Sequence, residues 1–204
     1  MGDYVYRERQ GATPEAPLLV LLHGTGGEEN QFFELGQHLL AGARLVAPRG
    51  DVSEGGALRY FRRKAEGVYD MDDLDRATGK LAAFVAARRA EGKAERVFGF
   101  GYSNGANVLA SVLFNHPELF DGAALLHPLI PFAPPPAPGL AGRRILITAG
   151  RRDPIAPAGE TQKLADYFGQ QGSEVSLAWH EGGHEVGREE IAAAQALLTG
   201  KPFA

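Results

Sequence analysis

The sequence contains no cysteine, which excludes disulfide bridges, a thiolate nucleophile and zinc or iron–sulfur sites built on cysteine. It also has no basic block: 21 Lys and Arg stand against 25 Asp and Glu, for a net charge of -4, so a nucleic-acid partner is not expected. No apolar run is long enough to cross a membrane, and residues 1–9 carry charges where a signal peptide needs an apolar stretch. These absences favour a cytoplasmic protein without membrane insertion.

The composition is that of one α/β domain spanning residues 1–204, because 44% of the residues are apolar and no Ser-, Gln- or charge-rich linker divides the chain. Short apolar runs alternate with stretches of helical periodicity, and this rhythm predicts a mostly parallel central sheet flanked by helices. The expected strands are residues 18–22, 44–48, 96–100, 122–126, 144–148 and 174–179, with 4–9 as an edge strand. The expected helices are residues 28–40, 71–91, 104–115, 158–171 and 185–198.

Two stretches have neither periodicity and are expected to be loops: residues 50–70, which are polar and glycine-rich, and residues 131–139, which contain five prolines. Loops at the carboxyl ends of parallel strands line the ligand crevice, so both segments are expected to shape a pocket without a separate lid domain. The basic and aromatic run at residues 59–64 leaves two interpretations open. It is either a solvated basic face or a site for an anionic group of a substrate.

The strongest local pattern is Gly101-Tyr102-Ser103-Asn104-Gly105, which stands between an apolar strand pattern and a helix pattern. A nucleophile elbow needs small residues two before and two after its serine, because the turn is sharp and strained. Such a turn would hold the hydroxyl of Ser103 above the sheet. An ordinary strand-to-helix turn is the alternative that the motif alone leaves open.

A second glycine-rich loop, Leu22-His23-Gly24-Thr25-Gly26-Gly27, follows the most apolar strand. Acyl transfer needs two backbone N–H donors for the oxyanion, one directly after the nucleophile and one from an earlier loop. Asn104 and Thr25 are the candidates for these donors. A phosphate-binding loop is the alternative, but Glu29 stands where the G-x-G-x-x-G pattern requires its last glycine.

A serine nucleophile needs a histidine to take its proton and an acid to orient that histidine. Asp153 follows the expected strand at residues 144–148, and His184 follows the next strand, so both fall on loops at the same edge of the sheet as Ser103. Asp121 and Asp166 are weaker candidates for the acid, because one precedes a strand and the other lies within a helix. His180 competes with His184 but is expected to end its strand.

The remaining histidines are given structural roles. His180 and His184 are four residues apart, as in a metal-binding helix, but Gly182 and Gly183 between them disfavour a helix, so no metal site is expected. His127 is expected in a pocket or in the core. His38 and His116 are expected to be solvent-exposed helix residues, and His23 is expected to shape its own loop.

These patterns resemble the phospholipase/carboxylesterase family of α/β-hydrolases, and within it bacterial hydroquinone-associated esterases and acyl-protein thioesterases. The resemblance rests on residues 22–27, 99–106, 150–157 and 182–185, and on residues 59–63 leading to 67–70. It implies the α/β-hydrolase fold, with Ser103 as nucleophile, Asp153 as acid and His184 as base. It also implies an oxyanion hole formed by the backbone amides of Thr25 and Asn104. Thioesterase relatives usually carry Gln after the serine, and the Asn found here bears on substrate preference.

The sequence therefore predicts a serine carboxylesterase that hydrolyses short- to medium-chain or aryl esters through an acyl-enzyme, without a cofactor. A thioesterase or lysophospholipase-type acyl hydrolase is the first alternative, and a non-catalytic binding protein on the same scaffold is the second. A small-molecule ester is the expected partner, and a homodimer is possible. Five apolar side chains are the expected substrate-binding walls: Phe32, Phe61, Leu129, Ile130 and Phe132.

Overall fold

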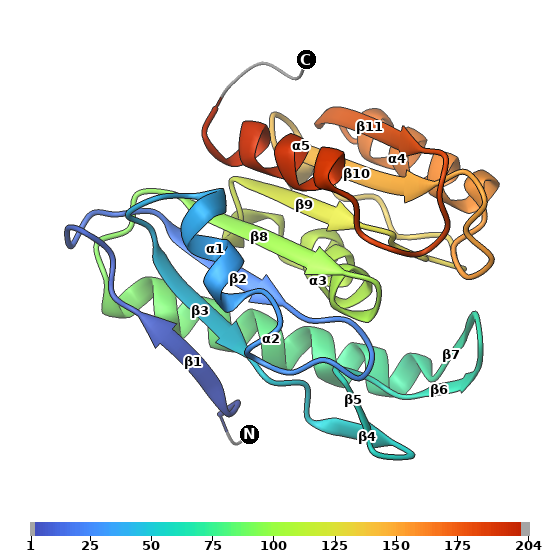
Figure 1. Ribbon diagram of the computed structural model, residues 1–204, viewed down its shortest axis with the longest axis horizontal. Coiled ribbons are helices and arrows are strands. Elements are labelled where there is room, and N and C mark those ends of the chain that lie inside the picture. Colours follow the sequence, from blue (N-terminus) through green and yellow to red (C-terminus); the bar gives the residue numbers. More distant parts are fainter. Residues whose placement is uncertain (1–2, 201–204) are drawn as a thin grey trace.

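A seven-stranded sheet lies at the centre of the computed structural model, which describes residues 3–200 (Figure 1). The strand order is β1-β3-β2-β8-β9-β10-β11. Only the edge strand β1 is antiparallel, and every other pairing in this sheet is parallel. The strands are β1 Tyr6–Arg9, β2 Leu18–Leu22, β3 Arg44–Pro48, β8 Val97–Tyr102, β9 Gly122–Leu126, β10 Arg144–Gly150 and β11 Glu174–His180. The charged segment at residues 1–9 is not expected to be a signal peptide, and its first two residues lie outside the described residues.

Helices cover both faces of the sheet (Figure 1), and each face has its own apolar core. In β2, Leu18, Val20 and Leu22 point into one core, while Leu19 and Leu21 point into the other. This period-two alternation between two buried faces explains why the strand is apolar at every position. The larger core is covered by α2 Met71–Glu91, α3 Asn104–Asn115 and α4 Ala158–Gln170, and the smaller one by α1 Phe33–Leu39 and α5 Arg188–Leu198.

The expected central strands are confirmed, and so are the boundaries of α2 and α3. Two helices begin later than expected. Residues 29–32 form turns before α1, in a segment where Glu28 and Glu29 pair with Arg49. Helix α5 begins at Arg188 because the side chain of Glu190 accepts a hydrogen bond from the backbone N–H of Gly187 and closes the first turn there.

The expectation of a loop over residues 50–70 is wrong. This segment forms two antiparallel hairpins: β4 Val52–Glu54 with β5 Ala57–Arg59, and β6 Arg63–Ala65 with β7 Val68–Tyr69. Gly55, Gly56 and Gly67 occupy the turns at positive φ values of 58°, 92° and 67°. Consecutive turn glycines between short strands are a hairpin signal, so the sequence did contain the information.

Residues 131–137 are irregular, as expected, and a short 3-10 helix, η2 Pro138–Leu140, ends the proline-rich segment. A second one, η1 Pro117–Leu119, follows α3. Between residues 3 and 200 the structure contains no helix that is both long and apolar enough to cross a membrane.

Candidate active site

Ser103 sits at the sharp turn between β8 and α3, with φ 51° and ψ -116°. Two glycines permit this turn. A Cβ atom on Gly101 would lie 2.7 Å from the carbonyl oxygen of Gly105, and one on Gly105 would lie 2.5 Å from the carbonyl oxygen of His23. Gly101 therefore lets the chain fold back on itself, and Gly105 lets the loop after β2 approach the start of α3.

The three residues expected to form a catalytic triad lie in one hydrogen-bonded chain. His184 Nε2 is 2.9 Å from Ser103 Oγ, and His184 Nδ1 is 2.7 Å from Asp153 Oδ2. The loops after β10 and β11 meet closely, since a Cβ atom on Gly150 would lie 2.0 Å from the carbonyl oxygen of Gly183. This contact brings Asp153 and His184, which are 31 positions apart in sequence, to the same edge of the sheet as the serine.

Tyr102 holds His184 in place, a role that the sequence pattern does not predict. Its hydroxyl donates a hydrogen bond of 2.7 Å to the carbonyl oxygen of His184, and the two ring centroids are 5.4 Å apart. Nothing in the motif predicts this contact for Tyr102, because the contact depends on where the loop after β11 places His184.

Asp153 is held as an anion by four hydrogen bonds. The backbone N–H groups of Ile155 and Ala156 donate to Oδ1, while His127 and His184 face Oδ2. Burial is the largest single influence and raises the pKa of Asp153, but these hydrogen bonds together outweigh it and the pKa is lowered from its usual value.

The backbone amides of Thr25 and Asn104 are the expected oxyanion donors, and neither N–H donates a hydrogen bond to an acceptor within residues 3–200. Both residues are anchored through their side chains. Thr25 Oγ1 accepts a hydrogen bond of 2.7 Å from Arg59 Nη1, and Asn104 Oδ1 accepts one of 2.8 Å from the backbone N–H of Tyr60. Asn104 is also the first residue of α3, so its amide lies at the positive end of the helix dipole.

The rival candidates lie away from Ser103. Asp121 accepts from the backbone N–H of Val97, at the start of β8 and therefore at the opposite edge of the sheet. Asp166 accepts from Gln162 on α4. His180 ends β11 and its Nε2 faces Glu190 and His127.

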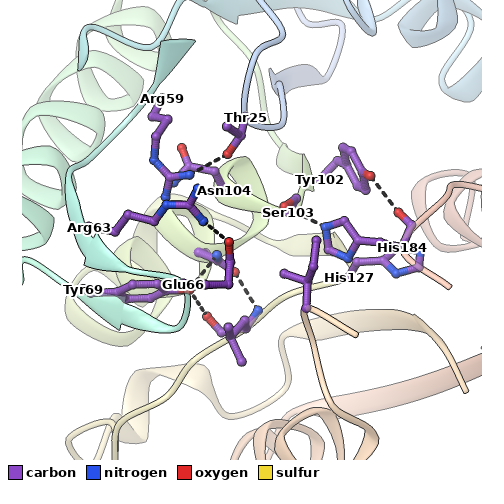
Figure 2. Close-up of a pocket in the computed structure, with 13 residues that line it drawn as sticks. Thr25, Arg59, Arg63, Glu66, Tyr69, Tyr102, Ser103, Asn104, His127 and His184 are labelled. Atoms are coloured by element: carbon purple, nitrogen blue, oxygen red, sulfur yellow. Dashed lines mark hydrogen bonds and ion pairs between the residues drawn. The ribbon is translucent and has the colours of Figure 1, made fainter. Parts of the chain in front are cut away.

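A cavity of about 240 Å³ lies beside Ser103 (Figure 2). Of the five expected substrate-binding residues, Leu129 alone is among its lining residues. Phe61 is fully buried in the core against Tyr69, and Phe32 packs on the rings of Phe100 and Tyr102. Apolar character alone did not separate these core rings from the cavity wall.

Ile130 and Phe132 line a different cavity, between the proline-rich segment and α4. The expectation that residues 131–139 cover the site is therefore not met. The two hairpins do reach it, and they contribute four side chains to its wall: Arg59, Arg63, Glu66 and Tyr69.

Within the basic run at residues 59–64, some arginines face the cavity and one faces solvent. Arg59 is only 3% exposed and faces the cavity, as does Arg63 (Figure 2). Arg62 points away, with 60% of its side chain exposed and ion pairs to Asp70 and Asp73. The interpretation as a solvated face thus holds for Arg62 and fails for Arg59.

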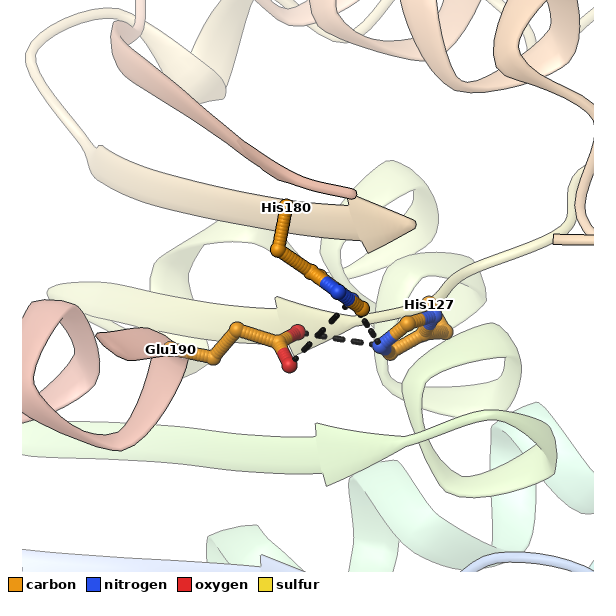
Figure 3. A group of neighbouring side chains, drawn as sticks. All are labelled: His127, His180 and Glu190. Atoms are coloured by element: carbon orange, nitrogen blue, oxygen red, sulfur yellow. Dashed lines mark hydrogen bonds and ion pairs between the residues drawn. The ribbon is translucent and has the colours of Figure 1, made fainter. Parts of the chain in front are cut away.

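Behind Asp153, a second group of close polar atoms consists of His127, His180 and Glu190 (Figure 3). The spacing of these atoms would suit a metal ion. However, His180 Nδ1 accepts a hydrogen bond of 3.0 Å from the backbone N–H of Gly182, so in the neutral ring the proton is on Nε2, the atom that a metal would need. Hydrogen bonds and ion pairs therefore hold these three side chains together.

Residues 7–190 match the model of the Dienelactone hydrolase family. The chain belongs to this family. The relative named "Putative hydrolase MhqD", from Bacillus subtilis (strain 168), is 39% identical over 180 residues, covering 87% of this chain and 90% of MhqD. The chain is accordingly a hydrolase of the dienelactone hydrolase and carboxylesterase type.

Solved structures agree with this membership of the dienelactone hydrolase family. The Bacillus cereus carboxylesterase is similar with a TM-score of 0.91 and 34% identity, over 97% of this chain and 94% of that one. Protein Atu2452 of unknown function from Agrobacterium tumefaciens str. C58 has a TM-score of 0.90 and 52% identity, over 98% and 97%. These neighbours confirm the α/β-hydrolase fold and the resemblance to carboxylesterases.

Proposed function

We propose that this protein is a serine carboxylesterase. The observation that carries the proposal is the continuous chain from Ser103 Oγ through His184 to Asp153, with distances of 2.9 and 2.7 Å. A hydroxyl becomes a competent nucleophile when an adjacent base accepts its proton and a carboxylate fixes the tautomer of that base.

The reaction proceeds in two steps. Ser103 Oγ attacks the carbonyl carbon of the ester as its proton moves to His184 Nε2, and the tetrahedral oxyanion forms between the amides of Thr25 and Asn104. His184 then gives the proton to the alkoxy oxygen, so the alcohol leaves and an acyl-serine remains. Water, deprotonated by His184, attacks the acyl-serine, and the acid is released as the proton returns to Ser103.

The size of the cavity favours small substrates. Its volume of about 240 Å³ is below the range of typical drug-sized ligand pockets, about 300–1,000 Å³. Leu129 and Ile155 provide apolar wall, and Arg59 and Tyr69 provide polar wall. We expect short acyl esters and small aryl esters to be hydrolysed faster than medium-chain esters.

Labelling with a fluorophosphonate, read by intact mass, tests the nucleophile. One adduct is expected on the wild type, and none on Ser103→Ala. Ser53→Ala, which changes an exposed serine on β4, is the matched control and should label fully. Unlabelled, folded wild type would contradict the proposal.

A panel of oxyesters and a thioester of the same acyl group then tests the bond that is cleaved. Faster turnover of the oxyesters is expected. Turnover of the thioester alone would replace the carboxylesterase proposal with a thioesterase one.

A further inference from the structure

His127 has an unusual backbone position. It directly follows β9 and has φ 50°, and Ser103 is the other non-glycine residue between positions 3 and 200 with a positive φ. The strands that lead to these two residues, β8 and β9, are neighbours in the sheet. Strained backbone of this kind persists where the surrounding structure determines it, and it concentrates at functional sites.

The side chain of His127 is completely buried between two carboxylates. Nδ1 lies 2.9 Å from Asp153 Oδ2, and Nε2 lies 3.0 Å from Glu190 Oε1 (Figure 3 shows the Glu190 side). Ionised carboxylates only accept hydrogen bonds, so two ionised partners require a proton on each ring nitrogen and therefore a cationic ring.

The titration behaviour of these groups agrees with that charge. Burial is the largest influence and lowers the pKa of His127, but the hydrogen bonds and charges of Glu190 and Asp153 outweigh it, so the pKa is raised. Burial likewise raises the pKa of Glu190, and the hydrogen bonds from His127, the Gly187 amide and Thr148 outweigh it and lower the pKa.

The carboxylate of Glu190 is held in a fixed position beside His127. It is 2% exposed, it belongs to the first turn of α5, and it accepts hydrogen bonds from the backbone N–H of Gly187 and the hydroxyl of Thr148. Its carboxylate therefore cannot turn away from His127 without leaving two other donors unpaired.

Four further titratable side chains face His127. His180 lies at the end of β11, His184 on the loop that follows, and Tyr102 at the end of β8 with its ring centroid 5.9 Å from that of His127. Glu185, which is exposed, acts on His127 through its charge. None of the four takes the place of Asp153 or Glu190 as a direct acceptor for His127.

Asp153 Oδ2 is consequently shared between two histidines: His184, which contacts Ser103, and His127. We propose that His127 is a positioning residue, a permanent buried cation held by Glu190, which fixes the Asp153 carboxylate and limits how strongly that carboxylate draws a proton onto His184. This inference rests on the proposed function. It adds that the His127–Glu190 pair sets the lower end of the pH range in which the enzyme works.

The kinetic test uses His127→Asn. Asparagine tolerates a positive φ and can still donate a hydrogen bond to Asp153, but it carries no charge. Without the cation, Asp153 attracts a proton to His184 more strongly, so the catalytic base stays protonated to higher pH. The acid limb of the kcat/KM profile should move up by about 1 pH unit, which is about a tenfold loss of kcat/KM below the limb.

His38→Asn, the same substitution at an exposed position on α1, is the matched control and should leave the profile unchanged. A purely structural role of His127 would lower the whole profile without moving its limb, and that result would overturn the proposal. Superposable profiles for His127→Asn and wild type would overturn it as well, while the esterase proposal would stand.

The second measurement is independent of turnover and of whether His127→Asn folds. Nitrogen-15 NMR of histidine-labelled wild-type protein should show one ring that keeps both protons above pH 7, assigned to His127 because its Nε2 signal changes in Glu190→Gln. In Glu190→Gln that ring should lose a proton at lower pH. A neutral His127 in the wild type at neutral pH would overturn the proposal even if ester hydrolysis had been confirmed.

Discussion

Asp153 divides two groups of side chains with similar chemistry. On one side, His184 keeps 17% of its side chain exposed and borders the cavity with Ser103. On the other side, His127 and Glu190 are 0% and 2% exposed, although His127 also belongs to the wall of this cavity. In the proposed mechanism the exposed histidine exchanges a proton with the substrate, whereas the buried one lies between two carboxylates and keeps its proton. The difference teaches that burial and partners, rather than residue type, assign roles around one carboxylate.

The largest expected effect is on the exposed side. Ser103→Ala should lower kcat for ester hydrolysis by about three orders of magnitude or more, because the nucleophile is lost while the fold remains. Steady-state kinetics on a short-chain ester measures the loss, and circular dichroism checks the fold. Unchanged turnover would show that another group on this face attacks the ester.

Asp153→Asn changes the carboxylate that both sides share. Both oxygens of Asp153 accept hydrogen bonds, one from the backbone N–H groups of Ile155 and Ala156 and the other from the two histidines. An amide has a single acceptor oxygen and a donor in place of the second, so His184 is left in the wrong tautomer or orientation, and kcat should fall by about two to three orders of magnitude. Asp166→Asn, at an exposed position of α4, is the control. Equal activity of the two variants would remove Asp153 from the mechanism.

Arg59→Met tests how the loop after β2 is anchored beside the site, since Arg59 holds the side chain of Thr25. Losing the hydrogen bond to Thr25 Oγ1 leaves the Thr25 amide less well placed, and kcat should fall about tenfold, less than the loss of a whole oxyanion donor. Arg62→Met, from the same segment but pointing away from the cavity, should change kcat little. A similar loss in both variants would indicate a general effect on the hairpins.

Thermal unfolding separates the buried side from the exposed one. A histidine with a raised pKa contributes stability that is full below its unfolded pKa, about 6.5, and is lost as the pH rises through the folded pKa. The Tm difference between wild type and His127→Asn should therefore be larger at about pH 6 than at about pH 9, by a few degrees. His116→Asn, which changes a partly exposed histidine, should show no such dependence.

The smallest expected effect concerns the two cavities. Leu129→Ala enlarges the space beside Ser103 and should shift the preference toward longer acyl chains by a few-fold in kcat/KM, whereas Phe132→Ala opens the other cavity and should not. The Leu129 backbone is held independently by Asn107 and Tyr69, so its position survives the substitution. An acyl-length panel distinguishes the two variants.

Much of this arrangement was predictable because it is encoded locally. The period-two and helical patterns predicted the central sheet and α2, and the spacing of Gly101 and Gly105 around Ser103 predicted the elbow. Helix α1 was extended too far, since acidic residues at positions 28 and 29 continue a helical pattern but pair with Arg49. The hairpins were missed although their turn glycines were present.

The cavity wall was predicted poorly because it depends on packing between segments. Phe61, between the two hairpins, and Tyr69, on β7, touch each other and are both buried in the larger core, yet Tyr69 lines the cavity and Phe61 does not. Both are large and aromatic, so composition does not distinguish them. Only the path of the hairpins over the sheet decides which ring meets the cavity.

The sequence by itself determined the elements, the elbow and the order in which Ser103, Asp153 and His184 follow successive strands, because these depend on neighbouring residues and on periodicity. The tertiary structure alone decided that His127 shares Asp153 with His184 and that Glu190 closes the pair from α5. The reason is physical. These contacts exist only once β8, β9, β10 and β11 lie side by side, and burial between two carboxylates then makes a charged His127 the stable form.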